Sequence, residues 1–128
     1  MENFKCALID QGIHIQGKAQ DLNGKDYEVS LFISYEEENL SWGEAMKWAK
    51  DHGGMPTCAQ LQAIQIHRDE INKLLEEAGK EVLTGWYWTS EELDSRFARC
   101  VRMNYGHVSI GYKEYGHYVR AVSAFPIE

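Results

Sequence analysis

Apolar residues alternate with polar ones near both ends of the chain, and a helical spacing occupies the middle. Near the start, the alternation predicts strands over Phe4–Ile9, Ile13–Ile15 and Tyr27–Ile33. Between the last two strands, Asn23-Gly24 favours a two-residue type I′ hairpin, because both central residues of that turn need positive φ. The acidic run Glu36-Glu37-Glu38 that follows is typical of a solvated connection.

The first helix is predicted to begin at Ser41, which forms a capping-box pattern with Glu44. Gly53-Gly54 supplies a left-handed stop, so this helix should end near His52. The apolar residues of its buried side recur at steps of three and four and are Trp42, Ala45, Met46 and Ala49.

A second helix is predicted to open where Thr57 and Gln60 repeat the capping-box pattern. The run His67-Arg68-Asp69 indicates a break, after which Asp69 caps a continuation that ends at Gly79. The side chains expected to face inward are Leu61, Ile64, Ile71, Leu74, Leu75 and Ala78.

The last part of the chain returns to strand patterns separated by turn residues. The predicted strands are Trp86–Thr89, Phe97–Met103, Val108–Tyr112 and Tyr118–Phe125. Strands, two helices and strands again predict an α+β fold in which two helices pack on short antiparallel strands. We expect a single domain over residues 1–128, divided into N-terminal strands (1–40), a helical part (41–79) and a C-terminal β-meander (80–128).

The composition is that of a globular domain, with 128 residues of which 44% are hydrophobic. The net charge of −7 is uneven: residues 1–95 hold 8 Lys+Arg against 18 Asp+Glu, and residues 96–128 hold 5 against 2. The two parts therefore carry −10 and +3. The acidic total, without a run of Lys or Arg, argues against binding to nucleic acid, whereas the basic tail suits an acidic partner.

Three widely spaced cysteines fit neither a disulfide framework nor a CxxC motif, so we expect reduced, buried thiols. No apolar run approaches the length of about 18 residues that indicates a transmembrane helix, and we expect no membrane insertion. The first residues do not show the basic and apolar regions of a signal peptide. On this basis the expected location is the cytoplasm or a phage particle.

From Ser41 onwards the chain resembles bacterial C-type-lectin-like modules in a combination of short motifs. These motifs are Trp42 with Ala45, Gly54-Met55-Pro56-Thr57 with Leu61, Tyr87-Trp88-Thr89-Ser90-Glu91, and Tyr118 to Val122 through Phe125. Such modules include the Legionella collagen-like C-terminal domain type, the Fibrobacter-type major paralogous domain and the variable proteins of diversity-generating retroelements. The resemblance implies a C-type-lectin-like fold and a binding module that is not an enzyme, with a ligand surface that differs among members.

The motifs by which calcium-dependent lectins hold their ion are absent, and the last strands contain few carboxylates. We therefore expect no metal and no cofactor. Arg120, inside an apolar strand, is expected to be a paired structural residue, for which Glu91 is one plausible partner. Trp86, Tyr87 and Trp88 are expected to serve the core before any ligand.

The candidate ligand-binding residues lie in the basic tail, where they alternate with apolar residues or occupy turns. Tyrosine and arginine dominate binding hot spots because they offer large contact areas. The candidate residues are Arg96, Arg99, Arg102, Tyr105, His107, Tyr112, Tyr115 and His117. We expect residues 96–118 to bind a protein or glycan ligand, with an ordinary amphipathic β-meander as the alternative interpretation.

Two other functions stay open at this point. Cys58 is expected in the first turn of a helix, where the dipole favours a thiolate, and this position suits a small thiol-dependent enzyme. No pattern places a histidine beside it as a base. The other alternative is a structural subunit of a phage tail or surface appendage, and a homo-oligomer is compatible with each of these functions.

Overall fold

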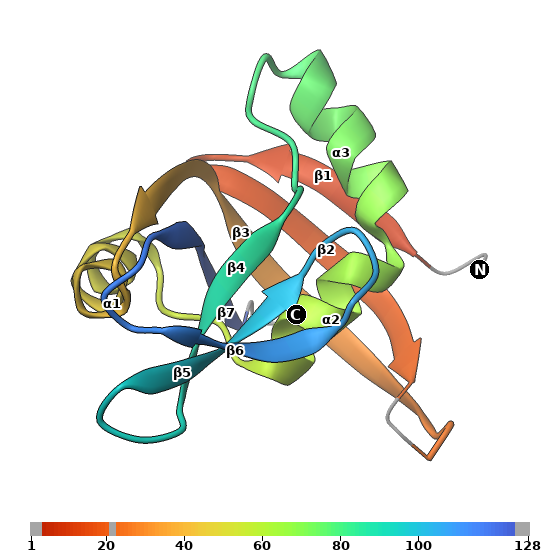
Figure 1. Cartoon of the computed structure of the whole chain (residues 1–128). Coiled ribbons are helices and arrows are strands. Elements are labelled where there is room, and N and C mark those ends of the chain that lie inside the picture. The colour runs from red at the N-terminus through yellow and green to blue at the C-terminus, as the bar shows by residue number, and fades with distance from the viewer. Residues whose placement is uncertain (1–3, 21–22, 125–128) are drawn as a thin grey trace.

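The computed structural model describes residues 4–20 and 23–124, which form one seven-stranded sheet and three helices (Figure 1). The strands are β1 (Lys5–Ile9), β2 (Gly12–Gln20), β3 (Asp26–Leu40), β4 (Trp86–Glu92), β5 (Phe97–Arg102), β6 (Val108–Tyr112) and β7 (His117–Ala124). The helices are α1 (Trp42–His52), α2 (Cys58–Ile66) and α3 (Arg68–Glu77). Among the described residues, no helix has the length and apolar character needed to cross a membrane.

The predicted fold class, an α+β arrangement of two helices on short antiparallel strands, is wrong. Strands account for 45% of the structure and helices for 26%, so the sheet dominates. The strand order is β1-β2-β3-β7-β4-β5-β6, and the sheet is mixed because β4 runs parallel to β7. The difference arises mainly from the length of β2 and β3, which have 9 and 15 residues, and from a third helix.

The acidic run belongs to β3 and is not the solvated connection that its charge suggested. Glu36 and Glu38 are exposed, while the side chain of Glu37 between them is turned inward and only 9% exposed. Successive residues of a strand point to opposite faces, so the middle one of three consecutive glutamates enters the interior while its two neighbours face the solvent. A bulge between Ile33 and Glu37 interrupts the pairing of β3 with β7 just before this position.

The β2–β3 hairpin is confirmed, but its turn is longer than the two-residue type I′ turn predicted at Asn23-Gly24. The ladder ends at the pair formed by Gln20 and Asp26, which are more than two residues apart. Residues 21 and 22 themselves lie outside the described part of the chain. Gly24 has a φ of 79°, which is the positive value expected of it.

Most helix boundaries follow the sequence pattern. Helix α1 ends at His52, and Gly53 follows with a φ of 134°. At the start of α2, the Gln60 amide donates to Thr57 Oγ1 (3.1 Å) and the Thr57 amide donates to Gln60 Oε1 (3.0 Å), which confirms the capping box. His67 separates α2 from α3, so the predicted break is also confirmed.

Two of the predicted N-terminal caps are wrong. Ser41 does precede α1, but its hydroxyl donates to the Glu44 carboxylate (3.0 Å) instead of accepting from a main-chain amide. Helix α3 begins at Arg68 with His67 in the capping position, so Asp69 lies inside the helix.

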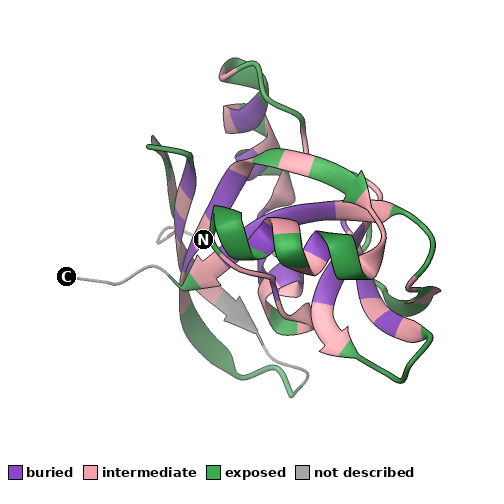
Figure 2. Ribbon diagram, turned by 90° about the vertical axis from the view of Figure 1, so that its left-hand side faces the viewer, coloured by how far each residue is buried: buried purple, intermediate pink, exposed green. Residues whose placement is uncertain are grey.

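Helices cover both faces of the sheet, which gives the protein two apolar cores. Neighbouring residues of a strand point to opposite faces, and accordingly Tyr87 lies in one core and Trp88 in the other. Ala45 and Ala49 of α1 pack in the core of Trp88. The residues of α2 and α3 in the core of Tyr87 are Leu61, Ile64, Ile71 and Leu75. Figure 2 shows buried residues on the inner strands and exposed ones on the loops and outer helix surfaces.

The predicted C-terminal β-meander is only partly correct. Strands β4, β5 and β6 do form consecutive antiparallel pairs. Strand β7 instead returns to the middle of the sheet, where it pairs antiparallel with β3 and parallel with β4 at Tyr87 and Tyr118. This leaves β6 at an edge of the sheet (Figure 1). Phe125, predicted as the end of this last strand, lies outside the described residues.

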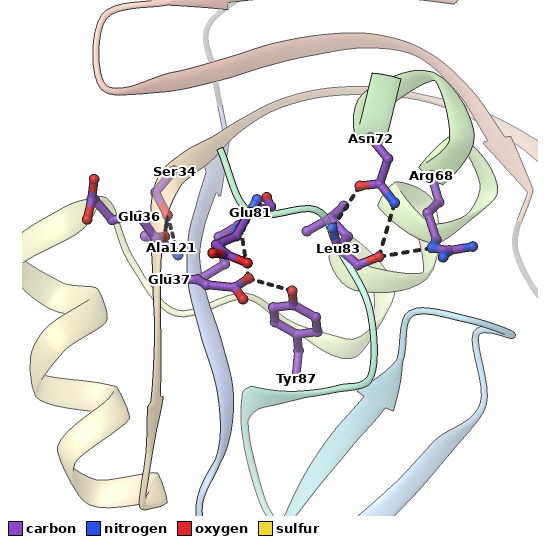
Figure 3. Close-up of polar contacts among 10 residues, drawn as sticks. Ser34, Glu36, Glu37, Arg68, Asn72, Glu81, Leu83, Tyr87 and Ala121 are labelled. Carbon is purple, nitrogen blue, oxygen red and sulfur yellow. Dashed lines mark hydrogen bonds and ion pairs between the residues drawn. The ribbon is translucent and has the colours of Figure 1, made fainter. Parts of the chain in front are cut away.

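A buried ion pair joins β3 to β7. Arg120, 1% exposed, donates from Nη2 to Glu37 Oε1 (2.8 Å) and to the Glu81 carbonyl (2.9 Å). The Tyr87 hydroxyl donates to the same carboxylate oxygen of Glu37 (2.6 Å; Figure 3). Burial raises the pKa of Tyr87 above its ordinary value, so the hydroxyl keeps its proton for this bond. The partner of Arg120 is therefore Glu37 and not the suggested Glu91.

Hydrogen bonds from α3 hold the connection between α3 and β4 in place beside this ion pair. Leu83 donates its amide to Asn72 Oδ1 (2.7 Å), and its carbonyl accepts from Asn72 Nδ2 (3.1 Å) and Arg68 Nε (3.0 Å; Figure 3). These bonds fix the segment that carries the Glu81 carbonyl towards Arg120.

Replacing Glu37 with alanine should lower the free energy of unfolding by about 3–5 kcal/mol, because the buried guanidinium of Arg120 then lacks its counter-charge. The matched control is Glu38→Ala, one position along β3 and exposed, for which we expect a change within about 0.5 kcal/mol. Urea unfolding at neutral pH measures both. Equal effects of the two substitutions would mean that the ion pair does not carry this stability.

Candidate binding site

The predicted binding residues lie along the β5–β6 hairpin and the turns at its two ends. The two strands pair from Phe97 opposite Tyr112 to Val101 opposite Val108. Arg96, Tyr112 and Tyr115 lie at the first of these ends, and Arg102, Tyr105 and His107 lie at the other. The structure therefore divides the predicted site into two groups, with Arg99 and His117 outside both.

The first group surrounds a hollow of about 380 Å³ on the surface. This tyrosine hollow is lined by Ser95, Arg96, Tyr112, Lys113, Glu114 and Tyr115. The ring of Tyr112 lies 4.5 Å from that of Phe97 and 5.4 Å from that of Tyr115, measured between ring centres. Tyr112 is thus held by rings on two sides, while Tyr115 is 65% exposed and available for contact.

Main-chain hydrogen bonds fix the two turns that carry the tyrosine hollow. Asp94 Oδ1 accepts from the amides of Arg96 (2.8 Å) and Phe97 (2.9 Å), which shapes the turn before β5. The hydrogen bond from the Arg96 amide lowers the pKa of Asp94 below its ordinary value. The Lys113 amide donates to the Arg96 carbonyl (2.9 Å) and links the turn to the end of β6. A ligand therefore meets a surface that is already ordered.

The two cations of the tyrosine hollow differ in availability. The ammonium group of Lys113 pairs with the Glu92 carboxylate and lies 4.6 Å from the centre of the Trp42 ring. Its side chain is only 14% exposed. Arg96 is exposed and forms no ion pair among the described residues. Arg96 is therefore the cation that a ligand can reach.

Arg102, Tyr105 and His107 form a second cluster at the opposite end of β6. The guanidinium carbon of Arg102 lies 4.9 Å from the centre of the Tyr105 ring, which in turn lies 5.8 Å from the His107 ring. Gln62 of α2 donates to the Gly106 carbonyl (3.3 Å) and holds this turn against the helix. The length of β6 separates this cluster from the tyrosine hollow.

The remaining two predicted residues have structural neighbours. Arg99, within β5, lies 3.9 Å from a carboxylate oxygen of Glu91. His117 is half-buried, with its ring edge-on to Trp88 at 4.7 Å, and burial lowers its pKa. A Cβ atom at Gly111 would lie 2.8 Å from His117 Nε2, so this packing requires glycine there.

Cys58, the candidate nucleophile, is half-buried at the first position of α2. Its amide donates to Glu91 Oε2 (2.7 Å), and its Sγ lies 3.9 Å from Thr89 Oγ1. Burial is the largest cause that raises the pKa of the Cys58 thiol, and the negative charge of Glu91 is the second. No histidine is among the groups that shift this pKa. Within residues 4–20 and 23–124, no cluster of His, Cys, Asp or Glu is arranged to hold a metal ion.

Sequence reasoning missed Ser95, which lines the tyrosine hollow but lies just outside the predicted segment 96–118. Lys113 and Glu114, which also line the hollow, lie within that segment. Val108 and Ile110 of β6 are 40% and 46% exposed, although their alternation with polar residues is typical of a half-buried strand. The alternation of apolar and polar residues shows that β6 has one apolar face. Whether that face is buried depends on which elements pack against it.

Comparison with known proteins gives a partial match to an enzyme. A stretch of 55 residues is 38% identical to part of the N5-carboxyaminoimidazole ribonucleotide synthase of Bacillus subtilis (strain 168). The match covers 43% of this chain and 14% of the length of that enzyme. No protein-family model matches the chain. Part of this chain is thus similar to part of an enzyme, over too short a stretch to establish catalysis.

Cys58 should react more slowly with iodoacetamide at neutral pH than the same cysteine in the urea-unfolded chain. Its raised pKa leaves a smaller thiolate fraction, and the thiolate is the species that reacts. Peptide mapping by mass spectrometry distinguishes it from Cys6 and from the buried Cys100. Faster labelling in the folded protein would contradict this prediction and favour a thiol-dependent enzyme.

Proposed function

We propose that this chain is a non-catalytic recognition module that binds a protein or glycan ligand, without calcium, through the tyrosine hollow. The observation that carries the proposal is the arrangement of Arg96, Tyr112 and Tyr115 around one ordered concave surface. Exposed tyrosines supply rigid contact area at a low entropic cost, and arginine adds directional hydrogen bonds and charge. Residues 96–118 hold four Lys and Arg residues and one Glu, whereas the chain as a whole is acidic.

The resemblance to bacterial C-type-lectin-like modules supports the same proposal from the sequence. In those modules the ligand surface differs among members, and in the retroelement-diversified ones the varied positions lie in the corresponding C-terminal segment. Residues 96–118 of this chain contain five of the six residues that line the tyrosine hollow. The proposal therefore assigns ligand choice to the turns and stability to the sheet beneath them.

The proposal is tested by screening the purified full chain against arrayed glycans and against displayed linear peptides of random sequence. The tightest binder from either screen then serves as the probe for titration calorimetry. We expect a saturable binder whose affinity depends on the tyrosine hollow. If neither screen returns one, the chain is not a recognition module of this kind.

Tyr115→Ala should weaken binding of that probe by about 2 kcal/mol, because Tyr115 is the most exposed ring of the hollow. Tyr105→Ala is a matched control, since Tyr105 is also a turn tyrosine, 63% exposed against 65%, at the other end of β6. Both variants should melt within a few degrees of the parent. If only Tyr105→Ala lost affinity, the ligand would bind at the end of β6 that carries Tyr105, and the assignment to the tyrosine hollow would be wrong.

Calcium should leave both stability and binding unchanged. Among residues 96–118 the sole carboxylate is Glu114, whereas a calcium ion takes about six to eight oxygen ligands. The melting temperature with millimolar calcium and with EDTA should agree, as should the affinity for the probe. A clear rise in melting temperature with calcium would overturn the metal-independent part of the proposal.

A thiol-dependent enzyme using Cys58 is the second candidate, and the partial similarity to an enzyme is the observation that favours it. The raised pKa of Cys58 and the absence of a histidine among the groups that shift it weigh against this candidate. The two functions make opposite predictions for Cys58→Ser, which should leave ligand binding intact but abolish thiol catalysis.

A further inference from the structure

Strand β6 has an open main-chain edge beside the tyrosine hollow. In an antiparallel pair, residues that exchange hydrogen bonds alternate with residues that exchange none. The Arg102 amide donates to the His107 carbonyl (2.8 Å) at one end of the β5–β6 ladder, and the Lys113 amide donates to the Arg96 carbonyl (2.9 Å) at the other end. Hydrogen-bonded residues recur at every second position of β6, so residues 109 and 111, which lie between 107 and 113, also bond to β5. Residues 108, 110 and 112 therefore point their amides and carbonyls away from β5.

Most of these outward groups are unused. The Tyr112 carbonyl accepts from the Tyr115 amide (3.0 Å). In the part of the chain that the structure describes, no group hydrogen-bonds to the main chain of Val108 or Ile110. The side chains of the same three residues form an apolar row that is 40–47% exposed. Open main-chain groups and an exposed apolar row therefore coincide on β6.

Natural proteins usually protect such an edge with charges, proline, bulges or a covering segment. β1, the other edge of the sheet, begins with Lys5. Val-Ser-Ile-Gly-Tyr, the sequence of β6, contains neither a charged residue nor proline, and it pairs with β5 without a register shift. An unprotected edge of this kind is a template for adding a strand.

We infer that β6 binds an extended, acidic segment of a partner protein, which adds to the sheet as a further strand. This inference rests on the proposed binding function and names the ligand class for it. Arg96 lies at one end of β6 and Arg102 at the other, and neither forms an ion pair among the described residues. Of the four Lys and Arg residues in 96–118, Lys113 and Arg99 already face Glu92 and Glu91, so Arg96 and Arg102 are the cations that an acidic segment would complement.

The same charges disfavour a second copy of this chain on β6. An antiparallel pair of β6 strands related by a two-fold axis would bring the end of the hairpin that carries Arg96 in each copy to the same edge as the end that carries Arg102 in the other. An acidic partner segment avoids that repulsion. Its apolar side chains would lie along Val108 and Ile110, and its end would reach the tyrosine hollow beside Tyr112.

The test compares Ile110→Pro with Ile110→Val, using linear peptides selected from a random displayed library as the probe. Proline removes the outward amide of residue 110 but no bond of the β5–β6 ladder, so an edge strand tolerates it. We expect selected peptides to alternate apolar residues with Asp or Glu. Ile110→Pro should weaken their binding about tenfold or more, and Ile110→Val should leave it within about twofold.

A second measurement keeps the test independent of how Ile110→Pro folds. The selected peptide is resynthesised with one N-methyl amide at a time and titrated against the unaltered protein. Pairing with β6 predicts that methylation at every second residue weakens binding, because alternate amides of an added strand face the sheet. Uniform or absent sensitivity would overturn strand addition.

The remaining outcomes separate the inference from the proposed function. Peptides that bind through Tyr115 but ignore both Ile110→Pro and N-methylation would leave the recognition function intact and overturn the β6 assignment. Binding to glycans alone would do the same. A concentration-dependent dimer, seen by analytical ultracentrifugation and abolished by Ile110→Pro, would make a second copy the occupant of β6 and overturn the acidic partner. Failure of both screens removes the proposed function itself.

Discussion

Glu37 of β3 and Arg120 of β7 form an ion pair inside the protein, 2.8 Å apart, and the arrangement of the sheet depends on it. A guanidinium that is 1% exposed is stable only with a counter-charge and further hydrogen bonds. Glu37 supplies the charge, the Glu81 carbonyl accepts a second bond from Arg120, and the Tyr87 hydroxyl donates to the same carboxylate oxygen of Glu37. Together these groups join β3, β7, β4 and the connection after α3. The last strand is thereby held in the middle of the sheet.

That central position of β7 has a consequence for the surface. Because β7 fills the place between β3 and β4, the β5–β6 hairpin extends to the outside and β6 becomes an edge. The helices pack over the middle of the sheet and leave the row of Val108, Ile110 and Tyr112 exposed. The candidate site therefore lies where a rigid sheet ends and two short turns begin, which separates stability from ligand choice.

The two proposals place different parts of this edge in contact with a ligand. The tyrosine hollow offers aromatic side chains and Arg96, and it would suit a glycan as well as a peptide. The open main chain of β6 suits an extended polypeptide only, since strand addition needs a backbone with alternating donors and acceptors. The partial similarity to an enzyme bears on neither proposal. The raised pKa of the Cys58 thiol does not indicate a reactive thiol, so it does not strengthen the enzyme alternative.

The sequence by itself determined the local features of this protein. The capping box of Thr57 and Gln60, the stop after His52, the break at His67 and the strand Val108–Tyr112 were all predictable, because each depends on residues a few positions apart. Only the tertiary structure decided that β3 runs through the acidic run, that Arg120 pairs with Glu37, and that Tyr112 and Tyr115 share a hollow that excludes Tyr105. These features depend on which distant strands become neighbours. A pattern of polar and apolar residues shows which face of a strand is apolar, but the packing of other elements determines whether it is buried, paired or left exposed to bind.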